Sequence, residues 1–398
     1  MSFLHYIYRN IQYLKITSAV LVLTATMFLI LQIWESNDLD RFSRFGNRID
    51  IRKTMFNKEK RSCQPRTNIF FLKTHKTASS TIVNILFRYG EFHNLTFALP
   101  VRSIDFFLPS PFSATKVNGF NKSGNTTFNI MCHHMRFMFS EVQKVMPYDT
   151  FYFTVLRNPI SLMESSFSYF KVKEPFARAT NLEDFFNNTS KYYNSKILNS
   201  YIAKNFMTFD LGFDHHGPDS IKNVKLIQGT VDAIFDLVLI TEYFDESLIL
   251  LKEALCWSFD DILSFPLNRR SNTTMKTLTF QTQEKIKRWN SLDWQLYVHF
   301  NNSFWKRVDE FGRERMQREV RILQRKRAEN EKMCLQGEVA PSQLEDKSMM
   351  PYQSGIAAIL GYNLKPGLTK FYQLLCQRLV TPEIQYSRLL RFKQFKKN

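Results

Sequence analysis

The chain has 398 residues, of which 44% are apolar and 15% aromatic, so a folded globular body is expected rather than a disordered chain. Its formal net charge of +18 at pH 7 favours ligands that carry phosphate or sulfate groups, anionic lipid headgroups or nucleic acid. The Lys and Arg residues are scattered, and neither zinc-finger spacing nor an RNP-type aromatic motif accompanies them. We therefore expect no nucleic-acid partner.

An uncharged apolar segment covers residues 16–33. Its 18 residues are close to the minimum that crosses a ~30 Å hydrocarbon layer. A cleaved signal peptide is the alternative interpretation, but the bulky residues Gln32, Ile33 and Trp34 leave no small-residue cleavage site. We predict an uncleaved transmembrane anchor, preceded by a cytosolic tail over residues 1–15.

The orientation of this anchor depends on two opposing signals. More basic residues follow the segment than precede it, which by charge alone favours a cytosolic body. Asn-x-Ser/Thr sequons favour a lumenal body instead, because glycosylation occurs on secreted chains. These sequons are Asn94, Asn121, Asn125, Asn187, Asn188, Asn272 and Asn301. We predict a type II membrane protein with a lumenal body.

Residues 34–65 are polar and charged with little apolar periodicity, which is typical of a stem. The folded domain is expected over residues 66–398, with a helical extension at its C-terminal end. The five cysteines allow up to two disulfides and one free thiol in an oxidising lumen, and their pairing stays open. They are Cys63, Cys132, Cys256, Cys334 and Cys376.

Short apolar runs rich in β-forming residues alternate with helical patterns after the stem. This alternation predicts an α/β domain with a mostly parallel sheet covered on both faces. The predicted strands are residues 68–72, 128–132, 150–156 and 235–240, and the predicted helices are residues 80–89, 161–170 and 246–257.

Two further helical patterns lie nearer the C-terminus. Apolar residues spaced among many charges predict one long helix over residues 305–333. Residues 386–398 interleave apolar and basic side chains, which fits either a helix on a membrane surface or an ordinary surface helix.

Hydroxyl-bearing residues follow the predicted strand at 68–72 and open the next helix. A helix N-terminus offers free N–H groups and a positive dipole end, so this segment is typical of an anion-binding loop. Lys76 lies at its mouth, where an ammonium group can neutralise a phosphate or a leaving oxygen. A Walker-type loop is disfavoured because no glycine lies between Phe70 and Tyr89. The hydroxyl-bearing residues are Thr77, Ser79, Ser80 and Thr81.

A second anion site is predicted at the end of the strand at 150–156. Arg157 ends this strand, Asn158 and Pro159 form a turn, and Ser165 lies about two turns into the following helix. Arg157 and Ser165 can therefore bind one phosphate. Two anion sites at the same sheet edge imply a ligand with two separated anionic groups.

Both segments resemble the donor sites of sulfotransferases. Lys76 with residues 77–81 is similar to the loop that binds the 5′-phosphosulfate of PAPS (3′-phosphoadenosine 5′-phosphosulfate), and Arg157 with Ser165 is similar to the 3′-phosphate site. The chain resembles the galactose-3-O-sulfotransferase family from about Pro65 to Tyr386. The segments that carry the resemblance are FLKTHKTASST, ILFRYGEFHNLTFALP, CHHMRF, TVLRNP with ESSFSYF, EYFDESLILLKEALCW, FGRERM, ILGYNL and TPEIQY.

The resemblance implies a P-loop-like sulfotransferase fold, a Golgi membrane location and PAPS as the sulfate donor. Lys76 would stabilise charge on the bridging oxygen as it leaves. Ala78 departs from the wider pattern, in which many members have glycine, and this restricts how closely the backbone approaches the phosphosulfate. Lys73 is included in the donor site, and Arg270, with Arg269, is expected to add a contact to the 3′-phosphate.

A general base must take the proton of the acceptor hydroxyl, and histidine is the natural choice at neutral pH. His75, beside Lys76, is the first candidate, and His134, after the predicted strand at 128–132, is the second. His93, His133 and the carboxylate Glu242 remain alternatives. Cys132, His133 and His134 are adjacent and have no distant partner, so we expect no metal site.

The expected acceptor is a terminal β-galactose. The ILGYNL and TPEIQY segments favour a galactosylceramide acceptor, with lactosylceramide as a related lipid, presented at the membrane. Glycoprotein galactose, a catalytically silent galactoside-binding scaffold and a P-loop kinase are the alternatives. The oligomeric state stays open, with a homodimer as one candidate.

Overall fold

The computed structural model describes residues 63–396, apart from short gaps at 102–104, 123–125 and 272–274. The predicted tail and anchor, and the stem up to residue 62, lie outside the described residues. Among the helices that the structure describes, none has the length and apolar character needed to cross a membrane.

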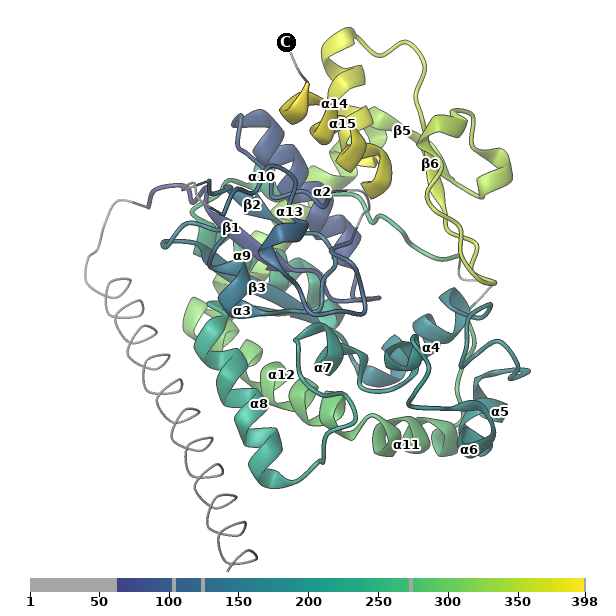
Figure 1. Ribbon diagram of the computed structural model, residues 1–398. Coiled ribbons are helices and arrows are strands. Elements are labelled where there is room, and N and C mark those ends of the chain that lie inside the picture. Colours follow the sequence, from purple (N-terminus) through teal and green to yellow (C-terminus); the bar gives the residue numbers. More distant parts are fainter. Residues whose placement is uncertain (1–62, 102–104, 123–125, 272–274, 397–398) are drawn as a thin grey trace, which may run out of the picture. The chain divides into compact units, whose positions relative to one another are not determined.

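Four parallel strands form the central sheet, as the alternation of strands and helices predicts (Figure 1). Every residue of the four strands is buried, because a parallel sheet is covered on both faces. The spatial order is β2-β1-β3-β4. The strands are β1 (Ile69–Leu72), β2 (Ile130–Met131), β3 (Phe151–Leu156) and β4 (Leu237–Ile240).

The helices predicted after three of these strands are present. They are α2 (Ser79–Phe92), α4 (Pro159–Tyr169) and α9 (Phe244–Leu255). In Figure 1, α2 lies on one side of the sheet, while α8 (Ile221–Ile234) and α12 (Ser291–Phe311) lie on the other. The predicted α/β class with a central parallel sheet flanked by helices is therefore confirmed.

The strand order creates a crevice beside β1. From β1 the chain passes to β2 on one side and then returns to β3 on the other. The segments that follow β1 and β3 therefore separate at the carboxyl edge of the sheet, which is where open α/β sheets bind their ligands.

The prediction of one long helix over residues 305–333 is wrong. The structure has two helices, α12 and α13 (Arg313–Cys334), separated by Gly312 at φ 95° and ψ 115°. Only glycine adopts this backbone conformation at low cost. The spacing of apolar residues therefore continues through Gly312, although the helix itself is interrupted there.

A C-terminal extension follows α13, and it contains two strands that the sequence patterns did not predict. Its antiparallel strands β5 (Leu335–Val339) and β6 (Gly361–Leu364) precede α14 (Lys370–Val380) and α15 (Glu383–Phe395). α15 corresponds to the C-terminal helical pattern for which the sequence favoured neither a membrane surface nor an ordinary protein surface. It packs on α2. Arg391 donates to the carbonyl oxygens of Pro100 and Val101, so most of α15 belongs to the folded body.

Shorter helices complete the described part of the chain. They are α3 (Phe139–Val142), α5 (Leu182–Asn187), α6 (Thr189–Tyr192), α7 (Phe206–Asp210), α10 (Phe259–Ile262) and α11 (Phe280–Trp289). Of these, α7 carries Asp210, a residue of the candidate active site.

Two disulfides fasten the ends of the described region. Cys63 pairs with Cys256, and Cys334 pairs with Cys376, while Cys132 is buried as a free thiol. This confirms the expected limit of two bridges and one remaining cysteine. The second bridge joins the end of α13 to α14 and so holds the C-terminal extension.

Candidate active site

The loop over residues 73–78, between β1 and α2, has an unusual backbone. Lys76 and Ala78 both have φ 58°, in the left-handed region that favours glycine. Ala78 is the N-cap of α2, and its side chain caps no N–H group. Among the described residues, the N–H groups of residues 77–80 have no hydrogen-bond acceptor. Free donors at a helix N-terminus are the feature that an anion-binding loop requires.

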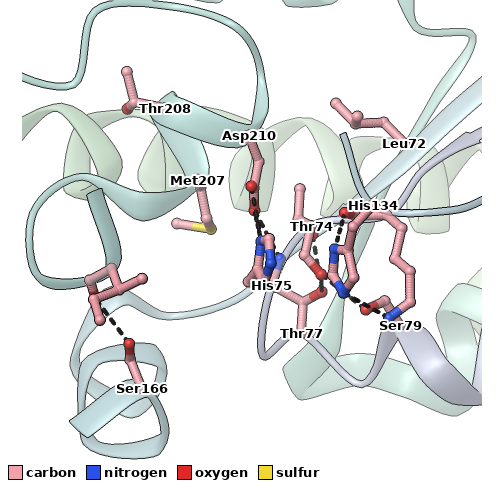
Figure 2. Close-up of polar contacts among 12 residues, drawn as sticks. Leu72, Thr74, His75, Thr77, Ser79, His134, Ser166, Met207, Thr208 and Asp210 are labelled. Carbon is pink, nitrogen blue, oxygen red and sulfur yellow. Dashed lines mark hydrogen bonds and ion pairs between the residues drawn. The ribbon is translucent and has the colours of Figure 1, made fainter. Parts of the chain in front are cut away.

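The hydroxyl groups of this segment hold the loop rather than extend its anion site. Thr77 and Ser79 both donate to the carbonyl oxygen of Thr74, at 3.1 and 2.8 Å. Figure 2 shows these side chains gathered around Thr74. Ser80 donates to Glu383 at 3.1 Å, and Thr81 accepts from the N–H of Leu267. The backbone amides are therefore the free donors of the loop.

Lys76 lies in a cationic environment. Its Nζ atom is 3.7 Å from the ring centroid of Tyr169. Burial, followed by the charges of Arg157, Lys73 and Arg270, lowers the pKa of Lys76 to about 7. An anionic ligand would remove this repulsion and favour the ammonium form.

Arg157 links the two predicted anion segments. Its Nη1 atom donates to the carbonyl oxygen of Lys76 at 2.7 Å, so the end of β3 clamps the loop after β1. Burial lowers the pKa of Arg157, which remains far above neutral pH. Asn158 caps α4 by accepting from Ile160, and Glu242 accepts from the N–H of Asn158 at 2.9 Å. Glu242 thus shapes the turn after Arg157.

Arg270 lies close to this cluster, while Arg269 does not. Arg270 is 9% exposed and pairs with Glu164 of α4 at 2.5 Å. Its Nη1 atom is buried with no partner among the described residues. Arg269 instead pairs with Glu338 of β5 at the surface. Ser165, next to Glu164, is half-buried, and its hydroxyl makes no hydrogen bond within the described region.

His75 forms a dyad with Asp210 of α7. The Nδ1 atom of His75 donates to Asp210 Oδ1 at 2.8 Å, and the N–H of His75 donates to Oδ2 at 2.7 Å. Figure 2 shows Asp210 facing the His75 ring from α7. With Nδ1 committed as a donor, Nε2 carries the lone pair, and among the described residues it has no partner. This arrangement suits a general base.

His134 is placed beside His75 but is bonded on both ring nitrogens. Nδ1 donates to the carbonyl oxygen of Lys73 at 3.0 Å, and Nε2 accepts from Lys73 Nζ at 2.8 Å. Its ring stacks on His75 with 3.8 Å between centroids. Burial, followed by His75 and Lys73, lowers the pKa of His134 well below its ordinary value. His134 supports the ring of His75 and has no free lone pair for a substrate.

Lys73 is bonded to residues of the protein itself. It is 3% exposed, and its Nζ atom also pairs with Glu383 of α15 at 3.0 Å. Among the described residues, neither of the alternative bases, His93 and His133, bonds or stacks on His75 or Lys76. His133 bonds Ser387 inside the body, and His93 caps the far end of α2, about 20 Å along that helix.

The sequence patterns missed Asp210 and Glu383. Asp210 lies in a helix of five residues, too short to show a periodicity, and it meets His75 across 135 residues of chain. Glu383 lies within the TPEIQY segment, which the family resemblance singled out without assigning a role. The presence of a carboxylate within a segment that resembles the family was the one sequence signal that could have pointed to Glu383.

Comparisons with known proteins find one family model and several relatives that this chain is similar to. A family model described as Galactose-3-O-sulfotransferase matches residues 1–394. Galactose-3-O-sulfotransferase 2 of Sus scrofa is 49% identical, over 83% of this chain and 85% of the relative. Galactosylceramide sulfotransferase of Homo sapiens is 43% identical, over 81% and 78%. Galactose-3-O-sulfotransferase 4 of Homo sapiens is 35% identical, over 84% of each.

Proposed function

The chain belongs to the galactose-3-O-sulfotransferase family, and on that premise we propose that it transfers a sulfuryl group from PAPS to the 3-hydroxyl of a terminal β-galactose. The donor supplies the sulfuryl group. The residues of the chain hold the donor, place the acceptor hydroxyl and take up its proton.

The cationic cluster fits a donor with two separated anionic groups. The free N–H groups of residues 77–80 and the ammonium of Lys76 suit the 5′-phosphosulfate. Arg157, Ser165 and Arg270 suit the 3′-phosphate. Arg270 supports this assignment through its buried Nη1 atom, which lacks a partner in the described part of the chain.

The observation that carries the proposal is the geometry of His75. Asp210 accepts from Nδ1 and so leaves Nε2 as the acceptor nitrogen, in the residue that precedes Lys76 in the same loop. His75 would take the proton of the attacking hydroxyl, while Lys76 would stabilise the negative charge that develops on the leaving phosphate oxygen. These two tasks are the ones that sulfuryl transfer requires.

The carrier of the galactose has two candidates. Galactosylceramide is favoured by the ILGYNL and TPEIQY segments. Galactose on glycoprotein glycans is supported by the higher identity to a relative named only for galactose, 49% against 43% for the relative named for galactosylceramide.

We also propose that the protein is a type II Golgi membrane protein with a lumenal catalytic domain. The apolar segment at 16–33 lies outside the described residues, as do Asn125 and Asn272. Two disulfides suit an oxidising lumen. The sequons Asn94, Asn121, Asn187 and Asn188 are exposed, whereas Asn301 is half-buried in α12. Endoglycosidase digestion should shift the mass of the cellular protein, and no shift would contradict the lumenal orientation.

The test of the reaction is transfer of label from radiolabelled PAPS by the full-length protein. Galactosylceramide and soluble N-acetyllactosamine should be compared as acceptors, with wild type and Lys76→Ala in parallel. Label in either acceptor that disappears in the variant would support the proposed reaction, and the preferred acceptor would decide the carrier. A folded wild-type protein that neither binds PAPS nor labels a galactoside would overturn it.

A further inference from the structure

Three helices of the described region meet at one carboxylate, Glu91 in the last turn of α2. Arg378 of α14 donates to Glu91 at 2.8 Å, and the hydroxyl of Tyr386 of α15 donates to it at 2.6 Å. Lys393, near the end of α15, also pairs with Glu91 at 2.5 Å. The end of α2, α14 and the second half of α15 therefore lie against one another here.

Large apolar side chains next to these contacts are exposed. Phe92 follows Glu91 and is 81% exposed, and Phe392 precedes Lys393 and is 63% exposed. On α14, Phe371 and Leu374 lie seven and four residues before Arg378, on the same helix face, and are 72% and 52% exposed. We define the aromatic face as Phe92, Phe371, Tyr372, Leu374 and Phe392. Exposed apolar clusters of this kind mark interaction surfaces.

The C-terminal stretch that carries most of the aromatic face is strongly basic. Residues 347–396 contain a single acidic residue, Glu383, and it is paired with Lys73 at 3.0 Å. The basic residues of the same stretch that are exposed are Lys347, Lys365, Lys370, Arg388, Lys393 and Lys396. Four of the five residues of the aromatic face, all except Phe92, thus lie in a stretch with a net positive charge, which complements an anionic partner.

We propose that the aromatic face docks the folded body onto an anionic lipid surface. Aromatic and leucine side chains enter the boundary between headgroups and acyl chains, while lysines contact the anionic headgroups. A protein partner fits less well, because lysine is depleted from protein interfaces, whereas the exposed Lys370 and Lys393 directly adjoin Phe371 and Phe392 of this face. The proposal concerns binding alone and requires neither the proposed reaction nor a lipid acceptor.

Amide hydrogen exchange of the full-length protein tests the proposal. It measures the protection of the segments that carry the aromatic face, even where another segment holds the chain to the vesicle. The protein is reconstituted into vesicles of phosphatidylcholine alone or with about 30% phosphatidylglycerol. We expect amides of residues 365–375 and 388–396 to exchange on the order of tenfold more slowly with the anionic lipid. Equal exchange in both vesicles would overturn the proposal.

Two variants and one matched control separate lipid docking from other causes. Phe371→Ser with Leu374→Ser removes apolar contacts, and Lys365→Glu with Lys370→Glu reverses charge; both should abolish the protection. Phe280→Ser is the control, since Phe280 of α11 is 77% exposed and lies outside the face. Protection that instead rises with protein concentration in detergent, without vesicles, would identify a contact between copies and overturn the lipid proposal.

Discussion

The carboxylate of Asp210 holds both the ring and the backbone of His75, through Nδ1 at 2.8 Å and the main-chain N–H at 2.7 Å. Asp210→Asn keeps the shape but allows the amide to stabilise the other His75 tautomer, with its lone pair on Nδ1. We expect kcat to fall by on the order of 10²-fold or more, as in other Asp–His pairs. Affinity for 3′-phosphoadenosine 5′-phosphate should change little, because the amide oxygen of the variant can still accept from the N–H of His75 and keep the loop in place.

His75→Gln should reduce kcat at least as strongly as Asp210→Asn. His93→Gln is the matched control, because His93 lies at the opposite end of α2 and should leave kcat unchanged. Steady-state kinetics with separate donor-binding measurements would check both. Full activity in His75→Gln would exclude His75 as the base.

Binding of 3′-phosphoadenosine 5′-phosphate should be coupled to proton uptake by Lys76. Burial and neighbouring cations lower the pKa of Lys76 to about 7 in the free protein, and a bound phosphate favours the charged amine. Calorimetry in buffers of different ionisation enthalpy should therefore show uptake of most of a proton at about pH 8 and little at about pH 6.

Lys76→Met should remove this uptake and weaken binding, whereas Lys76→Arg should bind without uptake because arginine stays charged. Subtracting the Lys76→Arg result also removes any protons exchanged by the ligand itself. Identical uptake in wild type and Lys76→Arg would show that another group takes the proton.

Arg270 and Arg269 are neighbours with opposite expected effects on donor binding. Arg270 is buried beside Lys76 and Arg157, whereas Arg269 is paired at the surface with Glu338. We expect Arg270→Ala to weaken binding of 3′-phosphoadenosine 5′-phosphate by about 10- to 100-fold, the loss typical of a charged hydrogen bond. Arg269→Ala should weaken it less than about threefold.

Arg270→Ala also leaves Glu164 without its ion pair, so stability must be measured alongside binding. Adding Glu164→Gln should restore the melting temperature but not the affinity. If the double variant recovered both, Arg270 would have a structural role only.

The parts of the site that follow strands could be predicted from the sequence. Residues after β1 and β3 must meet at one sheet edge, so Lys76 and Arg157 fall together once the strands are recognised. The hydrogen-bond partners of the loop hydroxyls could not be predicted. Thr77 and Ser79 donate to Thr74 because the loop turns through left-handed residues, and no glycine in the sequence indicates such a turn.

Contacts delivered by helices that are distant in sequence also escaped the sequence patterns. Asp210 and Glu383 reach the loop from α7 and α15, and no local periodicity relates either residue to His75 or Lys73. The break at Gly312 was missed for a related reason, since charged residues continue on both sides of it and hide the change of axis.

Asp293 of α12 holds α7, and with it Asp210, in place. Its carboxylate accepts from the N–H groups of Met207 and Thr208 and from the Thr208 hydroxyl at 2.7 Å. Burial raises the pKa of Asp293 from 3.8 to about 6. The folded state therefore binds this proton more tightly than the unfolded state, so the stability that it contributes is lost as the pH rises from about 4 to about 6.

Asp293→Asn removes this titration. Across that window, the unfolding free energy of wild type should fall relative to the variant by up to about 3 kcal/mol, following the size of the shift. Urea unfolding of both proteins at several pH values would measure the difference. A difference that does not vary with pH would show that Asp293 does not titrate there.

Gly355 lies where the segment before β6 crosses the end of α4, next to the residue whose ring covers Lys76. Its φ is +61°, and an added Cβ would lie 2.4 Å from the carbonyl oxygen of Ser168 and 2.5 Å from that of Tyr169. Both contacts are with backbone atoms, so Gly355→Ala must push the segment away from Tyr169. We expect a loss of stability of about 1–3 kcal/mol.

The same displacement should break the bond from the N–H of Ile356 to Ser168 and weaken donor binding, because Tyr169 packs against Lys76. Gly337→Ala is the matched control: an added Cβ there meets nothing within 4 Å. Thermal unfolding and donor-binding measurements on both variants would distinguish the sites. If Gly355→Ala and Gly337→Ala had equally small effects on stability and donor binding, the segment around Gly355 would be free to move over α4. Tyr169 would then hold its position over Lys76 without contact from this segment.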